Sequence, residues 1–112
     1  MTATITLKEP WEILSEGTIN PGATLQGDII DLTTFLSQRY LIRLKSVAQG
    51  RDLQFELAAY EDSGKIFESV FGKVGNSLNV AVNFSIASPN AVLDLTNNES
   101  FAVGYTILKV ID

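Results

Sequence analysis

The chain has 112 residues, the length of one domain with a modest hydrophobic core. It has no cysteine and no histidine, which excludes disulfides, zinc sites built on these residues, and catalysis by Ser-His or Cys-His pairs. Thirteen acidic and eight basic side chains give a net charge of −5, which disfavours nucleic acid and anionic membranes as partners. We therefore predict a single domain over residues 1–112.

Apolar and polar residues alternate along most of the chain, as is typical of half-buried β-strands. The expected strands, in chain order, cover residues 2–7, 11–19, 24–32, 40–47, 53–60, 65–71, 78–86, 91–95 and 101–107. Turn residues separate them, as in Asn20-Pro21-Gly22, and residues 72–77 are expected to form a hairpin loop. Helix evidence is confined to residues 31–38, where Asp31 or Thr33 could cap at most one short helix.

Eight or nine short strands separated by regular turns predict an all-β fold. We expect an antiparallel two-sheet β-sandwich, of which a jelly roll is one form, and a closed barrel is the alternative. No apolar stretch approaches the roughly 20 residues that span a bilayer. The first ten residues also lack the basic and apolar regions of a secretory signal. We therefore expect no signal peptide or transmembrane segment, and a location in the cytoplasm or in a virion.

Charged residues make up 19% of the chain, below the typical quarter, so part of the apolar surface is expected to be covered by another chain. Near the start, Trp11, Ile13 and Leu14 occupy both faces of their strand, and near the end Leu108 and Val110 lie opposite the core side. These residues are the predicted interface. The alternative is that a loop or the twist of the sandwich covers them.

Basic side chains on the strand at 40–47 could add a polar contact. Arg43 and Lys45 project to one face of that strand, where they could meet an acidic partner or form an ordinary solvated surface.

The best candidate for a metal site is the segment from Asp94 to Glu99. Asp94, Asn97, Asn98 and Glu99 carry oxygen ligands of the kind that calcium accepts. Their spacing matches no EF-hand, and the same residue types are common in turns. A structural calcium ion is therefore the weaker interpretation, and we expect no cofactor.

Exposed aromatic rings could form a platform for sugar binding. Tyr60 falls on the polar side of its strand, and Phe67 and Phe71 share a face opposite Ile66 and Val70. Core or interface packing is the alternative for these rings.

Two functions from different classes follow from these features. The first is a non-enzymatic assembly protein that docks on itself or on a larger protein lattice, of which a viral capsid cement or decoration protein is an example. The second is a β-sandwich module that binds carbohydrate or another ligand, with a structural calcium ion as an option. An enzyme ranks third, because nucleophile, base and oxyanion donors cannot be assembled from these residues.

Overall fold

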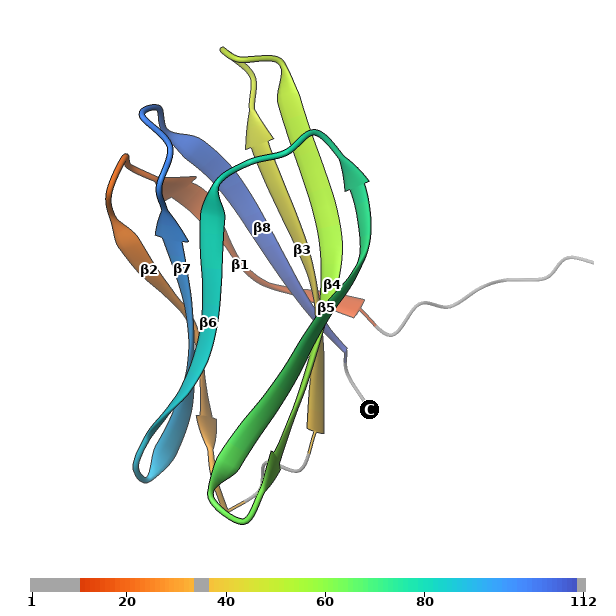
Figure 1. The fold of residues 1–112 in the computed structure, drawn as a ribbon, viewed down its shortest axis with the longest axis vertical. Coiled ribbons are helices and arrows are strands. Elements are labelled where there is room, and N and C mark those ends of the chain that lie inside the picture. Colours follow the sequence, from red (N-terminus) through yellow and green to blue (C-terminus); the bar gives the residue numbers. More distant parts are fainter. Residues whose placement is uncertain (1–10, 34–36, 111–112) are drawn as a thin grey trace, which may run out of the picture.

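A computed structural model describes residues 11–33 and 37–110, and this part of the chain forms eight strands and no helix (Figure 1). The strands are β1 (Trp11–Ile19), β2 (Thr24–Asp31), β3 (Ser37–Ser46), β4 (Arg51–Asp62), β5 (Lys65–Gly75), β6 (Val80–Ala87), β7 (Asn90–Asn97) and β8 (Val103–Val110). The strand predicted at residues 2–7 lies outside the described residues.

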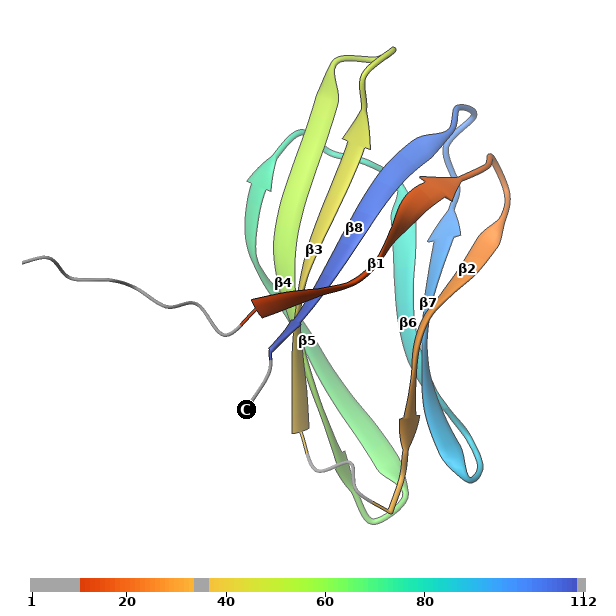
Figure 2. The same ribbon diagram turned by 180° about the vertical axis from the view of Figure 1, so that it is seen from behind.

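The two sheets are antiparallel and stack face to face as the predicted sandwich. Sheet A has the order β1-β8-β3-β4-β5, and sheet B has the order β2-β7-β6. Figures 1 and 2 show the two layers from opposite sides, with β2, β7 and β6 in one and β3, β4, β5 and β8 in the other. The pairs β1–β8 and β2–β7 are also those of a jelly roll. The sandwich differs from a jelly roll because β3 pairs with the next strand in the chain, β4, and β6 pairs with the next strand, β7.

The core lies between the sheets and is built by the alternation seen in the sequence. Its fully buried side chains come from both layers and include Tyr40, Ile42, Leu44, Leu57, Leu93, Leu95, Val103 and Ile107. Successive side chains of a strand point to opposite faces, so the residues between these project outward. The outward side chains of sheet A form the surface described below.

The segment at 31–38 forms no helix in its described part. Asp31 ends β2, and Ser37 already begins β3; residues 34–36 lie outside the described part. The Asp31 carboxylate accepts hydrogen bonds from the Thr33 backbone N–H at 2.9 Å and from the Thr33 hydroxyl at 2.8 Å. These two bonds, the backbone bond first, lower the pKa of Asp31. The predicted capping residues thus close a turn at the end of a strand.

The register shifts in three places, and each shift changes which side chains face the core. One bulge lies at Leu14 in β1, one at Gly27 in β2, and one at Gly72 and Lys73 in β5. The predicted loop at 72–77 is therefore wrong for residues 72–75, because β5 continues past its bulge to Gly75. Gly75 has a φ of 113° and lies against the Asp52 carbonyl, so no side chain fits there.

Candidate functional site

The outer face of sheet A brings together most of the residues that the sequence marked as candidates. Residues directly opposite each other in an antiparallel pair share a face, so the register gives rows of side chains across the five strands. One row runs through Ile13, Leu108, Leu41, Glu56 and Phe71. The terminal strands and the β4–β5 hairpin, which the sequence treated as separate sites, therefore contribute to one surface.

The lower part of this face, toward the β4–β5 turn in Figure 1, is mainly apolar. Trp11 pairs with Val110, and Tyr60 pairs with Phe67. The Tyr60 and Phe67 rings stack with centroids 5.1 Å apart and an angle of 18° between their planes. We call this part the apolar half. Its members are Trp11, Ile13, Arg39, Leu41, Glu56, Ala58, Tyr60, Phe67, Ser69, Phe71, Leu108 and Val110.

A groove crosses the apolar half where the side chains are small. It has a volume of about 360 Å³, and its lining includes Arg39, Ala58, Tyr60, Phe67 and Ser69. Arg39 lies beside it and pairs with Glu56 at 3.3 Å, and its guanidinium lies 5.9 Å from the centre of the Phe71 ring. These contacts hold a charged side chain in place on an otherwise apolar surface.

The upper part of the same face, toward the β3–β4 turn, is polar. We call it the polar half. Its members are Glu16, Thr18, Arg43, Lys45, Asp52, Gln54, Val74, Gly104 and Thr106. Arg43 Nε donates a hydrogen bond to Gln54 Oε1 at 3.0 Å. A hollow of about 580 Å³ opens here over Gly104. The predicted basic pair, Arg43 and Lys45, thus borders a hollow rather than an even surface.

Exposed apolar side chains concentrate on β5 rather than on the terminal strands. Nine large hydrophobic residues are exposed among those described, and β5 carries four of them: Phe67, Val70, Phe71 and Val74. Val70 and Val74 were not marked by the sequence. The predicted interface residue Leu14 lies at the bulge of β1 and packs against the core.

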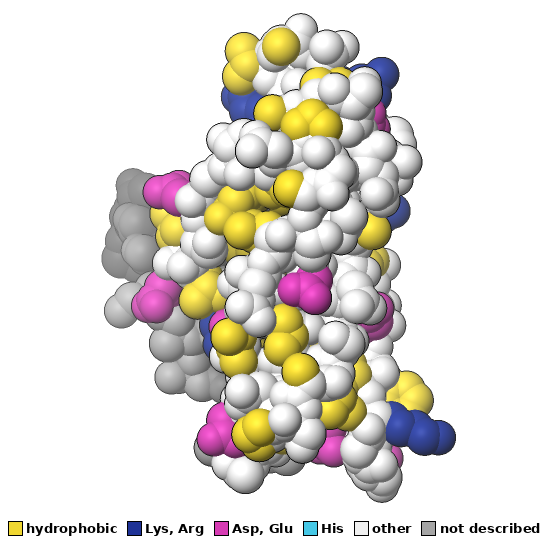
Figure 3. All heavy atoms as spheres, turned by 90° about the vertical axis from the view of Figure 1, so that its left-hand side faces the viewer, with side chains coloured by type: hydrophobic (Ala, Val, Ile, Leu, Met, Phe, Trp, Pro, Cys, Tyr) yellow, Lys and Arg dark blue, Asp and Glu magenta, His cyan; other side chains and the backbone are white. Residues whose placement is uncertain are grey.

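The side of the molecule on which β2 lies has a different character. In Figure 3 its hydrophobic side chains form small groups separated by backbone and other side chains, with acidic side chains among them. Ile29, on the outer face of sheet B, is the exposed large hydrophobic residue of β2, at 52%. We therefore take the outer face of sheet A as the candidate functional surface.

The backbone edge of β5 carries features that oppose strand addition. The bulge at Gly72 and Lys73 interrupts the edge, and Glu68 places a charged group on the side that faces sheet B. Its carboxylate accepts a hydrogen bond from the backbone N–H of Phe84 in β6. A partner that docks near β5 is therefore expected to contact the side chains on the outer face of sheet A and not to pair with the free backbone edge of β5.

Glu68 gives a pH-dependent prediction. Burial raises the pKa of Glu68, and the bond from the Phe84 backbone opposes this effect. Because the folded state then holds the proton more tightly than the unfolded state, stability falls as pH rises through the range between the two pKa values. Glu68→Gln should raise the melting temperature at about pH 7 relative to the unmodified protein and have less effect at about pH 3. Thermal unfolding at both values tests this, and an equal effect at both would contradict it.

The candidate metal ligands are not brought together. Asp94 projects from the outer face of sheet B, whereas Asn97 is buried on the inner side. Glu99 accepts a hydrogen bond from the Asn79 backbone at 2.8 Å and lies 4.0 Å from Arg51. Within residues 11–33 and 37–110, no group of three or more acidic side chains is placed to hold a metal ion.

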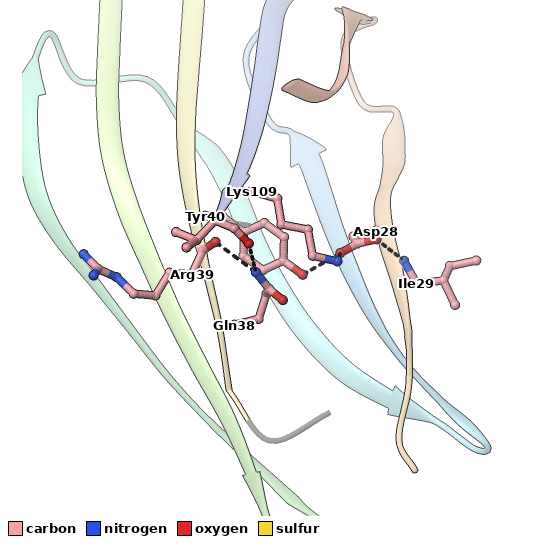
Figure 4. A network of polar contacts seen from close by, with 7 residues as sticks. Asp28, Ile29, Gln38, Arg39, Tyr40 and Lys109 are labelled. Carbon is pink, nitrogen blue, oxygen red and sulfur yellow. Dashed lines mark hydrogen bonds and ion pairs between the residues drawn. The ribbon is translucent and has the colours of Figure 1, made fainter. Parts of the chain in front are cut away.

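A polar cluster between the sheets was missed by the sequence analysis (Figure 4). The Tyr40 hydroxyl donates to Asp28 Oδ2 at 2.6 Å, and Lys109 Nζ lies 3.1 Å from the same oxygen. Strict alternation would place Asp28 outward, but the bulge at Gly27 turns it inward. The sequence feature that could have indicated this cluster is Lys109, the single lysine of the last strand, which lies at a position that faces the core. The cluster joins β2 of sheet B to β3 and β8 of sheet A by side-chain contacts inside the molecule.

Comparison with known proteins gives a structural likeness but no sequence match. No protein-family model and no curated protein matches the sequence. The crystal structure of the Acinetobacter phage vB_ApiP_P1 tailspike protein is similar. It aligns with a TM-score of 0.48 and 17% identity over 97% of this chain and 22% of the tailspike chain.

The part of the chain described by the structure contains no helix long and apolar enough to cross a membrane.

Proposed function

We propose that this chain is a non-enzymatic assembly module that associates with a second copy of itself through the apolar half. The observation that carries the proposal is the clustering of exposed side chains: Ile13, Tyr60, Phe67 and Phe71 lie on one side of one sheet. Large exposed apolar patches on soluble domains commonly mark interaction sites. Aromatic residues and arginine, here with Arg39 among the rings, are enriched at such sites.

The size of the patch fits a reversible contact. Five strands spaced about 4.8 Å apart span about 24 Å, and the rows of the apolar half cover about 20 Å along the strands. Each copy would then bury about 500 Å², or about 1,000 Å² in total, at the lower limit of specific interfaces. We therefore expect a dimer that forms and dissociates with concentration.

Charge favours a second copy as the occupant. On the outer face of sheet A, Arg39, Arg43, Lys45 and Lys65 balance Glu16, Asp52, Glu56 and Asp62. The chain as a whole has a net charge of −5, so most other surfaces of two copies repel each other. Two copies meet with the least repulsion through this neutral face.

In the apolar half, the geometry of the aromatic rings favours packing against a protein partner and not a platform for sugar binding. A platform for a pyranose ring needs a flat aromatic face open to solvent. Tyr60 and Phe67 stack on each other, so each ring already covers one face of its neighbour. A location in a virion and docking on a larger protein lattice remain predictions made from the sequence.

The substitution Phe67→Glu tests the proposal. It places a charge in the proposed contact on both copies, and loss of an aromatic residue that anchors an interface is worth about 2 kcal/mol or more. The dissociation constant of the dimer, measured by sedimentation equilibrium, should rise by more than about 30-fold. Phe67 is 45% exposed, so the isolated fold should tolerate the change.

The matched control is Ile29→Glu, which changes an equally exposed apolar residue on the outer face of sheet B. This variant should dimerise as the unmodified chain does. If the control weakens the dimer as much as Phe67→Glu, or if Phe67→Glu has no effect, the apolar half is not the contact.

A further inference from the structure

A glycine near the start of β8 in sheet A has no steric reason to be there. Gly104 lies in β8 between Thr18 of β1 and Lys45 of β3, and its φ is outside the left-handed region. A Cβ at this position would meet the Lys45 carbonyl at 3.4 Å and the Gly17 carbonyl at 3.8 Å, which are ordinary contacts. Glycine inside a strand weakens it and often marks a place where a ligand or another backbone approaches closely. The absent side chain leaves the hollow of the polar half.

The walls of this hollow carry hydrogen-bonding groups of every kind. Its volume is about 580 Å³, within the range of small-molecule sites. Arg43 and Lys45 supply donors, and Glu16 and Asp52 supply acceptors. The hydroxyls of Thr18 and Thr106 line it as well and can do both.

The charged groups around the hollow are not engaged with each other. Lys45 and Asp52 stand opposite in the register of β3 and β4, yet the ion pairs of the described residues include neither of them. Glu16 is likewise outside these pairs. Of the four charged residues, Arg43 makes a side-chain bond, and it uses only Nε. These groups are therefore free to bind a molecule that enters the hollow.

We propose that the hollow over Gly104 binds a neutral saccharide unit. Two basic and two acidic side chains border it, so their formal charges cancel and give no preference for an anion or a cation. Each hydroxyl of a sugar can accept a bond from Arg43 or Lys45 and donate one to Glu16 or Asp52, and bonds to charged groups are the stronger ones. The site is distant from the substitution at Phe67, because Asp52 and Tyr60, the register partner of Phe67, lie eight residues apart on β4, or about 26 Å.

The test is a titration of the isotope-labelled chain followed by amide chemical shifts. The probes are glucose, galactose, N-acetylglucosamine and lactose, with inorganic phosphate and calcium chloride as charged probes. At least one neutral sugar should shift the amides of Thr18, Lys45 and Gly104 saturably, with half-saturation in the millimolar range. The proposal is overturned if no sugar shifts these amides, or if phosphate or calcium shifts them more strongly than any sugar.

Variants show whether the hollow is responsible. Gly104→Val fills the hollow with a side chain that suits a strand, and it should weaken the sugar response at least tenfold. Lys45→Met removes a donor without changing the backbone and should weaken the response several-fold. Ala81→Val adds the same kind of side chain on the exposed face of sheet B and should leave the response unchanged. Unchanged binding by both hollow variants would contradict the proposal.

The saccharide site is independent of the proposed dimer. Phe67→Glu should bind the sugar as the unmodified chain does, and Gly104→Val should dimerise normally. Failure of one proposal would therefore leave the other standing.

Discussion

Asn97→Ala should lower the free energy of unfolding by about 3 kcal/mol or more. Asn97 is fully buried, and its Nδ2 donates to the Ile19 and Phe101 carbonyls, each at 2.9 Å. Its Oδ1 accepts from the Glu99 backbone N–H at 2.9 Å. Alanine would leave three backbone groups without these partners, and an unsatisfied buried group costs about 1–3 kcal/mol.

Chemical denaturation measures this loss, and Asn98→Ala is the matched control. Asn98 is the next residue, its side chain is exposed, and the bond in which it takes part uses its backbone N–H. The control should change stability by less than about 0.5 kcal/mol. Equal effects of the two substitutions would show that the buried amide does not hold the β7–β8 connection to β1.

The second large effect is expected at Asp28. Asp28→Ala would remove the acceptor of the buried Tyr40 hydroxyl and the partner of Lys109, whose side chain is 29% exposed. Breaking such a pair leaves a charge and a hydroxyl poorly solvated, and we expect a loss of about 3 kcal/mol. Tyr40→Phe, which keeps the ring and the Asp28–Lys109 pair, should lose less, about 1–2 kcal/mol.

Tyr40 offers an independent check of the same cluster. Burial first, and then the hydrogen bond to Asp28, raise the pKa of Tyr40 well above its ordinary value. Its hydroxyl should therefore stay protonated until the protein unfolds in alkali. An ultraviolet titration in which Tyr40 ionises while the chain is still folded would contradict this arrangement.

The strands could be predicted from alternation because half-buried strands impose a period of two. Residues 11–19 form β1 as expected, and β3 gives Tyr40, Ile42 and Leu44 to the core, as the sequence indicated. The failures occur at bulges, where one extra residue reverses the faces. At Gly27 the bulge puts Asp28 inward and leaves Ile29 52% exposed, opposite to the pattern of the sequence.

The surface could be predicted only in parts. Trp11, Val110, Tyr60 and Phe67 were each marked from their own strands, but nothing in the sequence states that β1 and β5 belong to one sheet. That information is in the pairing of β8 with β3, whose paired residues are 59 to 69 positions apart in the chain. Gly104 was unmarked, because a strand glycine acquires meaning only when its neighbours in the sheet are known.

Association of two copies of the chain through the apolar half makes the mass of the protein depend on its concentration. The most direct test is the mass in solution, by size-exclusion chromatography with light scattering over a hundredfold range of concentration. We predict a mass near 12.2 kDa at the lowest concentration that rises toward twice this value at the highest. A mass that stays at that of one chain across the whole range would contradict the proposal.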